Sequence, residues 1–241
     1  MRHRLRVDIS MYDRRGCFYL SSYQKLVMNM IEEHLDELDI GQKYLMEKSG
    51  ISWVLLYNCI ELKKQFTPDM KLTAVTWNSE IKAPLFRRDF VITDEASGED
   101  VASGATLSTL FDHKERRVCT DREKIRSISL EEGERICEIE RRFRPDCEFK
   151  TVDDRVARPS MADGIGHVNN TRYGEFVYDA MSDEERKKLS AVKRIDNWFF
   201  SELIPGDSFR IARGETDADE LTFIGSKTGD EKNAFAVKLR F

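Results

Sequence analysis

The chain has 241 residues, of which 40% are hydrophobic and 34% charged, and its formal net charge at pH 7 is −5. Its length suffices for one large core or two domain-sized units, and its acidic balance argues against general binding of nucleic acid. No apolar run approaches the roughly 20 residues of a membrane-spanning helix. Five cysteines without a CxxC pair favour reduced thiols over a disulfide framework or a zinc site. We therefore expect a cytoplasmic protein that has no membrane segment and needs no metal or cofactor.

The first half begins with an amphipathic helix. Apolar residues recur at helical spacing over 23–38, Ser21 and Gln24 form a capping box ahead of them, and Gly41 is a stop signal. His34 lies on the apolar stripe, where we expect it to be packed or hydrogen-bonded rather than catalytic. Runs rich in apolar and aromatic residues then predict strands at 51–65, 71–77, 85–92 and 101–111, with a turn at Thr67-Pro68-Asp69.

A charge-dense connector, 114–147, separates the two halves and has one candidate helix at 129–138. The second half starts with a candidate strand at 148–158. An apolar stripe from Tyr173 to Met181 predicts a second helix, and Ser182 with Glu185 caps a short extension. Further strands are predicted at 192–204, at 209–211, at 221–223 and at 235–241, with a turn at Pro205-Gly206-Asp207.

Each half therefore reads as a helix, a long strand, a proline turn and more strands. A run of strands with one helix per half indicates α+β packing, in which the helix lies on one face of an antiparallel sheet. We divide the chain into an N-terminal domain, 1–113, the connector, 114–147, and a C-terminal domain, 148–241. Two such units could pair their sheets edge to edge and hide exposed strand edges.

The most informative stretch, Asp-Gly-Ile-Gly-His-Val-Asn-Asn-Thr-Arg-Tyr at 163–173, opens the second helix. It brings an acid, an imidazole and two amides together, and Asn169 or Asn170 can cap the helix. The free N–H groups at a helix start can also hold developing negative charge. From the residues alone, a polar capped loop without chemistry is an equally good interpretation.

This organisation resembles the acyl-acyl carrier protein thioesterases, which are double hot-dog proteins. The resemblance implies a tandem hot-dog fold, with two antiparallel sheets that each wrap a central helix, over about 16–241. It also implies hydrolysis of acyl-acyl carrier protein to free fatty acid, the step that ends fatty acid synthesis. It rests on the run at 167–173 and on Ser52-Trp53-Val54-Leu55, Phe86-Arg87-Arg88-Asp89-Phe90, 103–110 and Pro205-Gly206-Asp207.

The resemblance implies a catalytic set of Asp163, His167 and Glu202. Glu202, with Asp163, would take the proton of the attacking water, and His167 would assist departure of the thiol. Backbone N–H groups at 168–171 would steady the oxyanion. Ile165 stands where the family has an asparagine. Either Asn169 or Asn170 supplies the missing amide as a substrate-binding residue, or the chain is a catalytically silent variant.

The resemblance also places the acyl chain in the first hot-dog, where Trp53, Phe86 and Phe90 either line a tunnel or form ordinary core. The implied partner is acyl carrier protein with a phosphopantetheine-linked acyl chain. That partner is acidic, so a local basic patch has to dock it, with Lys193 and Arg194 as first candidates. A monomer and a homodimer are both open. The alternatives are a non-catalytic acyl-binding hot-dog protein, an acyl-coenzyme A thioesterase and a dehydratase.

Overall fold

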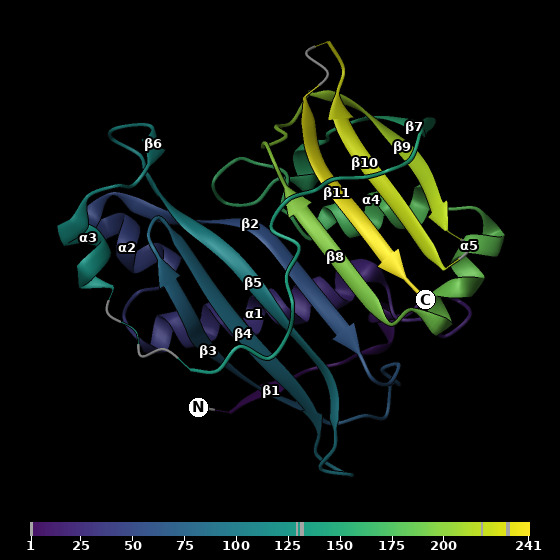
Figure 1. Ribbon diagram of the computed structural model, residues 1–241, viewed down its shortest axis with the longest axis horizontal. Helices are drawn as coiled ribbons and strands as arrows, with labels where there is room; N and C mark the ends of the chain where they lie inside the picture. Colours follow the sequence, from purple (N-terminus) through teal and green to yellow (C-terminus); the bar gives the residue numbers. More distant parts are fainter. Residues whose placement is uncertain (1, 129, 131–132, 218, 230–231) are drawn as a thin grey trace. The chain divides into compact units, whose positions relative to one another are not determined.

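The computed structural model describes residues 2–128, 130, 133–217, 219–229 and 232–241 (Figure 1). The chain forms two compact units, neither of them a single segment. The first unit comprises 1–7, 26–64 and 68–139, and the second comprises 8–25, 65–67 and 140–241. These units are groups of contacting segments and do not test the functional domains expected at 1–113 and 148–241, which stay a prediction. No helix in the described ranges is both long and apolar enough to cross a membrane.

The first unit is an antiparallel sheet with strands in the order β1-β3-β4-β5-β2, and β6 pairs with β5. Alternating apolar residues account for these strands, because side chains two positions apart share a face. Phe86, Phe90 and Ile92 are buried together with Leu107, as expected. The bounds are β1 (His3–Leu5), β2 (Ile51–Leu62), β3 (Leu72–Lys82), β4 (Leu85–Asp94), β5 (Asp100–Asp112) and β6 (Arg117–Val118).

Helix α1 (Leu20–Glu37) runs along one face of this sheet, behind β3, β4 and β5 in Figure 1. The expected capping box is wrong, since α1 begins at Leu20 and both Ser21 and Gln24 lie inside it. Gly41 does not end α1 but caps the start of α2 (Gln42–Ser49), a helix that the sequence pattern did not predict. Helix α3 (Arg122–Ser127) lies in the connector. Residues 129, 131 and 132 of the expected helix at 129–138 lie outside the described residues, and 133–138 are not helical.

The second unit is an antiparallel sheet in the order β8-β11-β10-β9-β7. Helix α4 (Arg172–Ala180) packs on β9 and β11, and its buried Phe176 lies against Phe209 of β9. Ser182 and Glu185 cap α5 (Asp183–Lys188), as predicted. The other bounds are β7 (Phe149–Val156), β8 (Arg194–Phe199), β9 (Ser208–Asp217), β10 (Glu220–Lys227) and β11 (Asn233–Arg240), with short 3-10 turns η1 (Ile9–Met11), η2 (Pro159–Met161) and η3 (Leu189–Ala191).

The strand expected over 192–204 is shorter than predicted. It stops at Phe199, because the N–H groups of Phe200 and Ser201 both turn to the carbonyl of Ala234. Residues 200–204 therefore leave the sheet as a loop. That loop carries Glu202 toward the start of α4.

Candidate active site

A tight loop at 163–167 presents His167. The Asp163 N–H donates to the His167 carbonyl (2.9 Å), and the Gly166 N–H donates to the Asp163 carbonyl (3.0 Å). The Asp163 carboxylate accepts from the Ile165 N–H at 3.0 Å. Gly166 has φ +87°, a left-handed conformation that favours glycine. The loop is thus closed by its own hydrogen bonds, and Asp163 holds it in shape.

His167 and Glu202 meet at the end of this loop. The His167 Nε2 lies 3.0 Å from a Glu202 carboxylate oxygen, and the two side chains are 37% and 61% exposed. The Val168 N–H donates to the Leu203 carbonyl at 2.7 Å, which ties the two segments together. An imidazole and a carboxylate at this distance, open to solvent, can share and pass a proton. The structure therefore brings this predicted pair together, while the catalytic roles stay a prediction.

A third side chain, Tyr173, lies close to the pair and was expected only as part of the helix stripe. It is buried and stacks on Phe235, with ring centroids 4.3 Å apart and planes 9° apart. Burial raises the pKa of Tyr173, and the nearby charges of Asp163 and Glu202 raise it further. The phenol therefore stays protonated as a hydrogen-bond donor beside both carboxylates.

The amides at the start of α4 are used differently from each other. The Asn169 side-chain oxygen accepts from the Thr171 N–H (3.0 Å) and the Thr171 hydroxyl (2.7 Å). Asn169 therefore makes the capping bond that was predicted for Asn169 or Asn170, although the regular helix begins at Arg172 and Thr171 makes no side-chain cap bond. The N–H groups of Val168, Asn169 and Thr171 all have partners. Within 168–171, all of which the structure describes, only Asn170 keeps its N–H without a partner.

The same loop occurs once before in the chain. Met11, Asp13, Gly16 and Tyr23 are each followed, 150 positions later, by an identical residue. The earlier loop has the same closure, with the Asp13 N–H bonded to the Cys17 carbonyl at 2.8 Å and Gly16 at φ +81°. The helix starts and turn prolines of the two halves are separated by different intervals, so they do not reveal this fixed spacing of 150 residues.

The earlier loop lacks the acid–imidazole pair. Cys17 stands at the position of His167, and Gln65 accepts from the Tyr23 hydroxyl (2.9 Å) at the place that Glu202 has beside Tyr173. Both loops belong to the second unit. A single unit thus holds two loops of one design, and only the later one has acid–base groups.

Of the predicted acyl-binding residues, Phe86 and Phe90 are buried in the first unit and Trp53 is half-buried. Phe86 and Phe90 are 2% and 0% exposed. Trp53 packs edge-on against Phe86 with centroids 5.0 Å apart, and its indole N–H donates to the Ile40 carbonyl at 2.8 Å. Their role as tunnel lining, rather than as core, stays a prediction.

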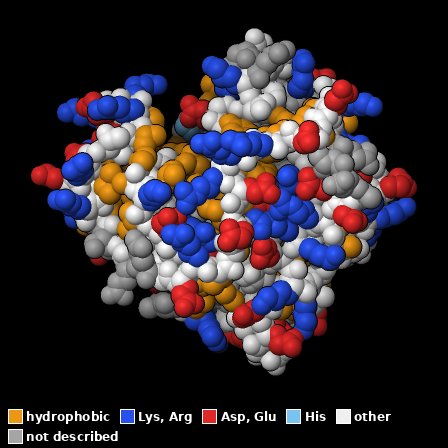
Figure 2. Space-filling view, viewed as in Figure 1, with side chains coloured by type: hydrophobic (Ala, Val, Ile, Leu, Met, Phe, Trp, Pro, Cys, Tyr) orange, Lys and Arg blue, Asp and Glu red, His pale blue; other side chains and the backbone are white. Residues whose placement is uncertain are grey.

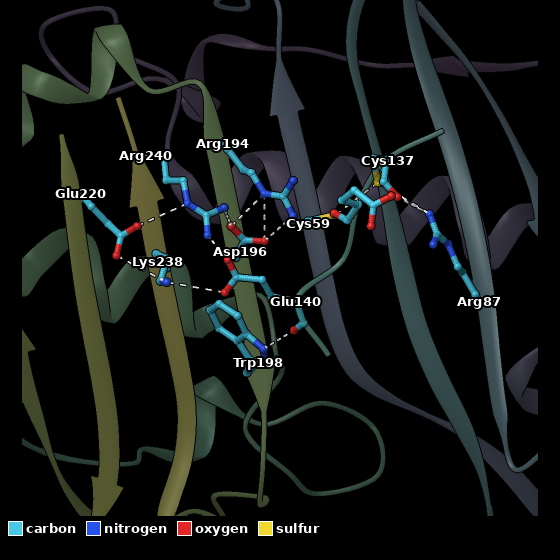
Figure 3. A network of polar contacts seen from close by, with 11 residues as sticks. Cys59, Arg87, Cys137, Glu140, Arg194, Asp196, Trp198, Glu220, Lys238 and Arg240 are labelled. Atoms are coloured by element: carbon cyan, nitrogen blue, oxygen red, sulfur yellow. Dashed lines mark hydrogen bonds and ion pairs between the residues drawn. The ribbon is translucent and has the colours of Figure 1, made fainter. Parts of the chain in front are cut away.

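Lys193 and Arg194 do not lie beside the pair. They stand at the start of β8 and Glu202 follows its end, roughly 20 Å away along the strand at about 3.3 Å per residue. Arg194 instead pairs with the buried carboxylate of Asp196 (2.9 Å), which also binds Arg240 (2.8 Å), as Figure 3 shows. The structure thus places Lys193 and Arg194 away from the pair, and their role in docking the partner stays a prediction.

The basic side chains near Asp196 are also paired with two glutamates. Glu140 and Glu220 each bind both Arg240 and Lys238 (Figure 3), so the connector end is held on the sheet of the second unit. Over the face that Figure 2 shows, basic side chains are interspersed with acidic ones. Within the described ranges, no three His, Cys, Asp or Glu side chains are grouped as a metal site requires.

Comparisons with known proteins place this fold among the hot-dog thioesterases. An acyl-ACP thioesterase from Bacteroides thetaiotaomicron has TM-score 0.85 and 20% identity, covering 100% of this chain and 97% of its own. A putative oleoyl thioesterase from Lactobacillus plantarum has TM-score 0.80, 19% identity and coverage of 100% and 94%. The 12:0-ACP thioesterase from Umbellularia californica has TM-score 0.79, 14% identity and coverage of 100% and 96%. The predicted tandem hot-dog α+β fold is confirmed.

The family follows from the sequence. Residues 1–128 match the family model described as the acyl-ACP thioesterase N-terminal domain. No curated protein matches the chain. Because the match covers more than half of its length, the chain belongs to the acyl-ACP thioesterase family and is a thioester hydrolase.

Proposed function

We propose that the chain hydrolyses acyl-acyl carrier protein with His167 and Glu202 as its acid–base pair and Asp163 as a positioning residue. The observation that carries the proposal is the 3.0 Å contact between the solvent-accessible imidazole and carboxylate. Glu202 takes a proton from water as the water oxygen bonds to the thioester carbon. The tetrahedral intermediate then collapses and the carbon–sulfur bond breaks, while the proton that Glu202 took from water passes through His167 to the departing thiolate, which returns both side chains to their starting state.

Asn170 is the proposed donor for the oxyanion and the proposed substitute for the family's asparagine. Its backbone N–H, just before the start of α4, has no hydrogen-bond partner among the described residues. The positive end of the dipole of α4 also favours a negative charge at this position. Ile165 cannot replace that amide, because its own N–H is bonded to Asp163 and its side chain is apolar. Asn169 is committed to Thr171.

Apolar side chains near the pair suit contact with the substrate arm. Ile165 is 54%, Phe200 44% and Ile204 45% exposed, and all three flank His167 or Glu202 in the chain. We propose that they touch the phosphopantetheine-linked part of the substrate, since exposed apolar groups of this size often mark binding surfaces. We also propose a cytoplasmic location, where the carrier protein would be met; pairing of two copies stays a prediction.

A panel of thioesters tests this function against its alternatives. Purified protein is given acyl-carrier protein and acyl-coenzyme A substrates of equal chain lengths, and released thiol is measured. Faster release from the carrier thioesters is the expected result. Release only from coenzyme A would reassign the substrate, and a change in double-bond absorbance would indicate a dehydratase. Bound lipid without turnover would indicate an acyl-binding protein, the interpretation that Ile165 favours.

A further inference from the structure

The interior of the first unit contains a buried guanidinium for which the described residues supply no counter-charge. Arg88 on β4 is 6% exposed, and its Nη2 is hydrogen-bonded to His34 Nδ1 on α1. Its Nε and Nη1 have no partner among the described residues. Burial lowers the pKa of Arg88 to about 10, and no carboxylate opposes that effect. His34 supplies no counter-charge, because a histidine side chain is neutral or cationic; burial and the Arg88 charge lower its pKa to about 4, so it is neutral at pH 7.

The neighbouring arginine on the same strand, Arg87, is also buried, but its charge is neutralised by a carboxylate. Arg87 points to the other face and binds the buried Asp89 through two hydrogen bonds of 2.7 Å and 2.8 Å. Burying a charge is costly unless it is paired. Two adjacent buried arginines therefore differ in one respect: Arg87 has its carboxylate within the described chain and Arg88 does not.

Asn78 adds unbonded polar groups beside Arg88. It faces Arg88 directly across β3 and β4, is 3% exposed, and has no partner for either side-chain polar atom among the described residues. Phe86 and Phe90 lie two positions on either side of Arg88 and share its face. A polar site thus interrupts the apolar surface that is expected to hold the acyl chain.

We infer that Arg88 and Asn78 bind a carboxylate at the far end of the acyl chain, so that the preferred substrates are half-thioesters of dicarboxylic acids. The inference rests on the proposed function. A hydrocarbon end would leave the unbonded N–H groups of both residues buried and unsatisfied, whereas a carboxylate accepts from both and supplies the missing charge. A hydroxyl satisfies a donor but leaves the charge uncompensated.

The first arm of the test measures turnover. Sebacoyl and decanoyl half-thioesters of the carrier protein, and matched pairs from the six-carbon to the sixteen-carbon acids, are compared for kcat/KM. We expect the carboxylate-ended member to be favoured about tenfold or more at one chain length. Arg88→Met should abolish that preference and Asn78→Leu should weaken it, while Phe90→Leu, the control, should affect both substrates alike. A preference for plain chains at every length, or an unchanged ratio in Arg88→Met, overturns the inference.

The second arm measures binding without turnover, so that it still decides the inference if no thioester is hydrolysed. Monomethyl sebacate and methyl decanoate are titrated into the wild-type protein and the two variants, and the thermal midpoint is followed. Tighter binding of the monoacid by the wild type alone supports the site. Equal binding of the two esters, or a preference that persists in Arg88→Met and Asn78→Leu, contradicts it. Absence of all thioester turnover with the expected ester binding would refute only the proposed function.

Discussion

The two matched aspartates, Asp13 and Asp163, should respond in opposite ways to removal. The Asp13 side chain is 1% exposed and accepts from the N–H groups of Arg15 (2.8 Å) and Cys17 (2.9 Å) and from the Tyr178 hydroxyl (2.8 Å). Each buried donor left without a partner costs about 1–3 kcal/mol. We therefore expect Asp13→Ala to lower the free energy of unfolding by about 3–5 kcal/mol.

Asp163 accepts one backbone hydrogen bond, from Ile165, and is half-buried. Asp163→Ala should cost only about 0.5–1.5 kcal/mol of unfolding free energy. It should nevertheless reduce thioester turnover about tenfold or more, because the loop that presents His167 loosens. Asp13→Ala, once corrected for its folded fraction, should keep turnover within about threefold, since its loop carries no acid–base pair.

Urea denaturation and steady-state hydrolysis, run on the same preparations, check both halves of this prediction. Cys17→Ala serves as a control that leaves the Asp13 carboxylate and its backbone donors in place. Equal destabilisation by the two aspartate variants would refute the reasoning, because the two loops would then be equally structural. Full turnover by Asp163→Ala would refute it as well.

Three further changes test the packing, the pH dependence and the site. A Cβ on Gly174 would lie 2.7 Å from the Ser21 backbone, so Gly174→Ala should lower the urea midpoint, whereas Gly164→Ala, with open space, should not. The pKa of His34 is lowered to about 4 in the folded protein, so the unfolded chain takes up a proton there first as the pH falls. The free energy of unfolding should therefore be unaffected by His34 above about pH 6.5 and should decrease as the pH falls toward 4. His34→Gln should flatten that loss, by at most about 2 kcal/mol after solvent screening, in urea titrations across this range. Asn170→Ala should reduce kcat/KM about tenfold, and Ile165→Ala less than about threefold.

Local patterns in the sequence were enough to predict most of the fold. Alternation placed β4 and β11, and the capping box at Ser182 placed α5. Helix α2 was missed because its eight residues bury only Leu45, too little for an apolar stripe. Gly41 and Gly50 flank it, and Gly50, at φ 64°, is a C-cap signal that could have been used.

The site was harder to predict because its geometry depends on contacts between distant segments. The family resemblance identified His167 and Glu202, but their contact depends on the packing of two distant segments, which the bond between Val168 and Leu203 joins. The distance of Lys193 from the pair was hard to predict for a similar reason, since it depends on where β8 ends.

The unpaired charge of Arg88 was invisible in the sequence. Arg87 and Arg88 are adjacent and chemically identical there, and only the strand's alternation sends one to Asp89 and the other to His34. The packing of the sheet and the helix therefore decides which of the two buried arginines forms an ion pair with a carboxylate.

A double-mutant cycle on the acid–base pair tests the central claim most directly. Turnover of acyl-carrier thioester is measured for His167→Ala, Glu202→Gln and the double variant, with thermal unfolding as a check on folding. Each single change should lower kcat by about 100-fold or more, and the double variant should be little worse than either, because paired groups act as a unit. Single variants that stay within about threefold of the wild type, or losses that simply multiply, would contradict the account.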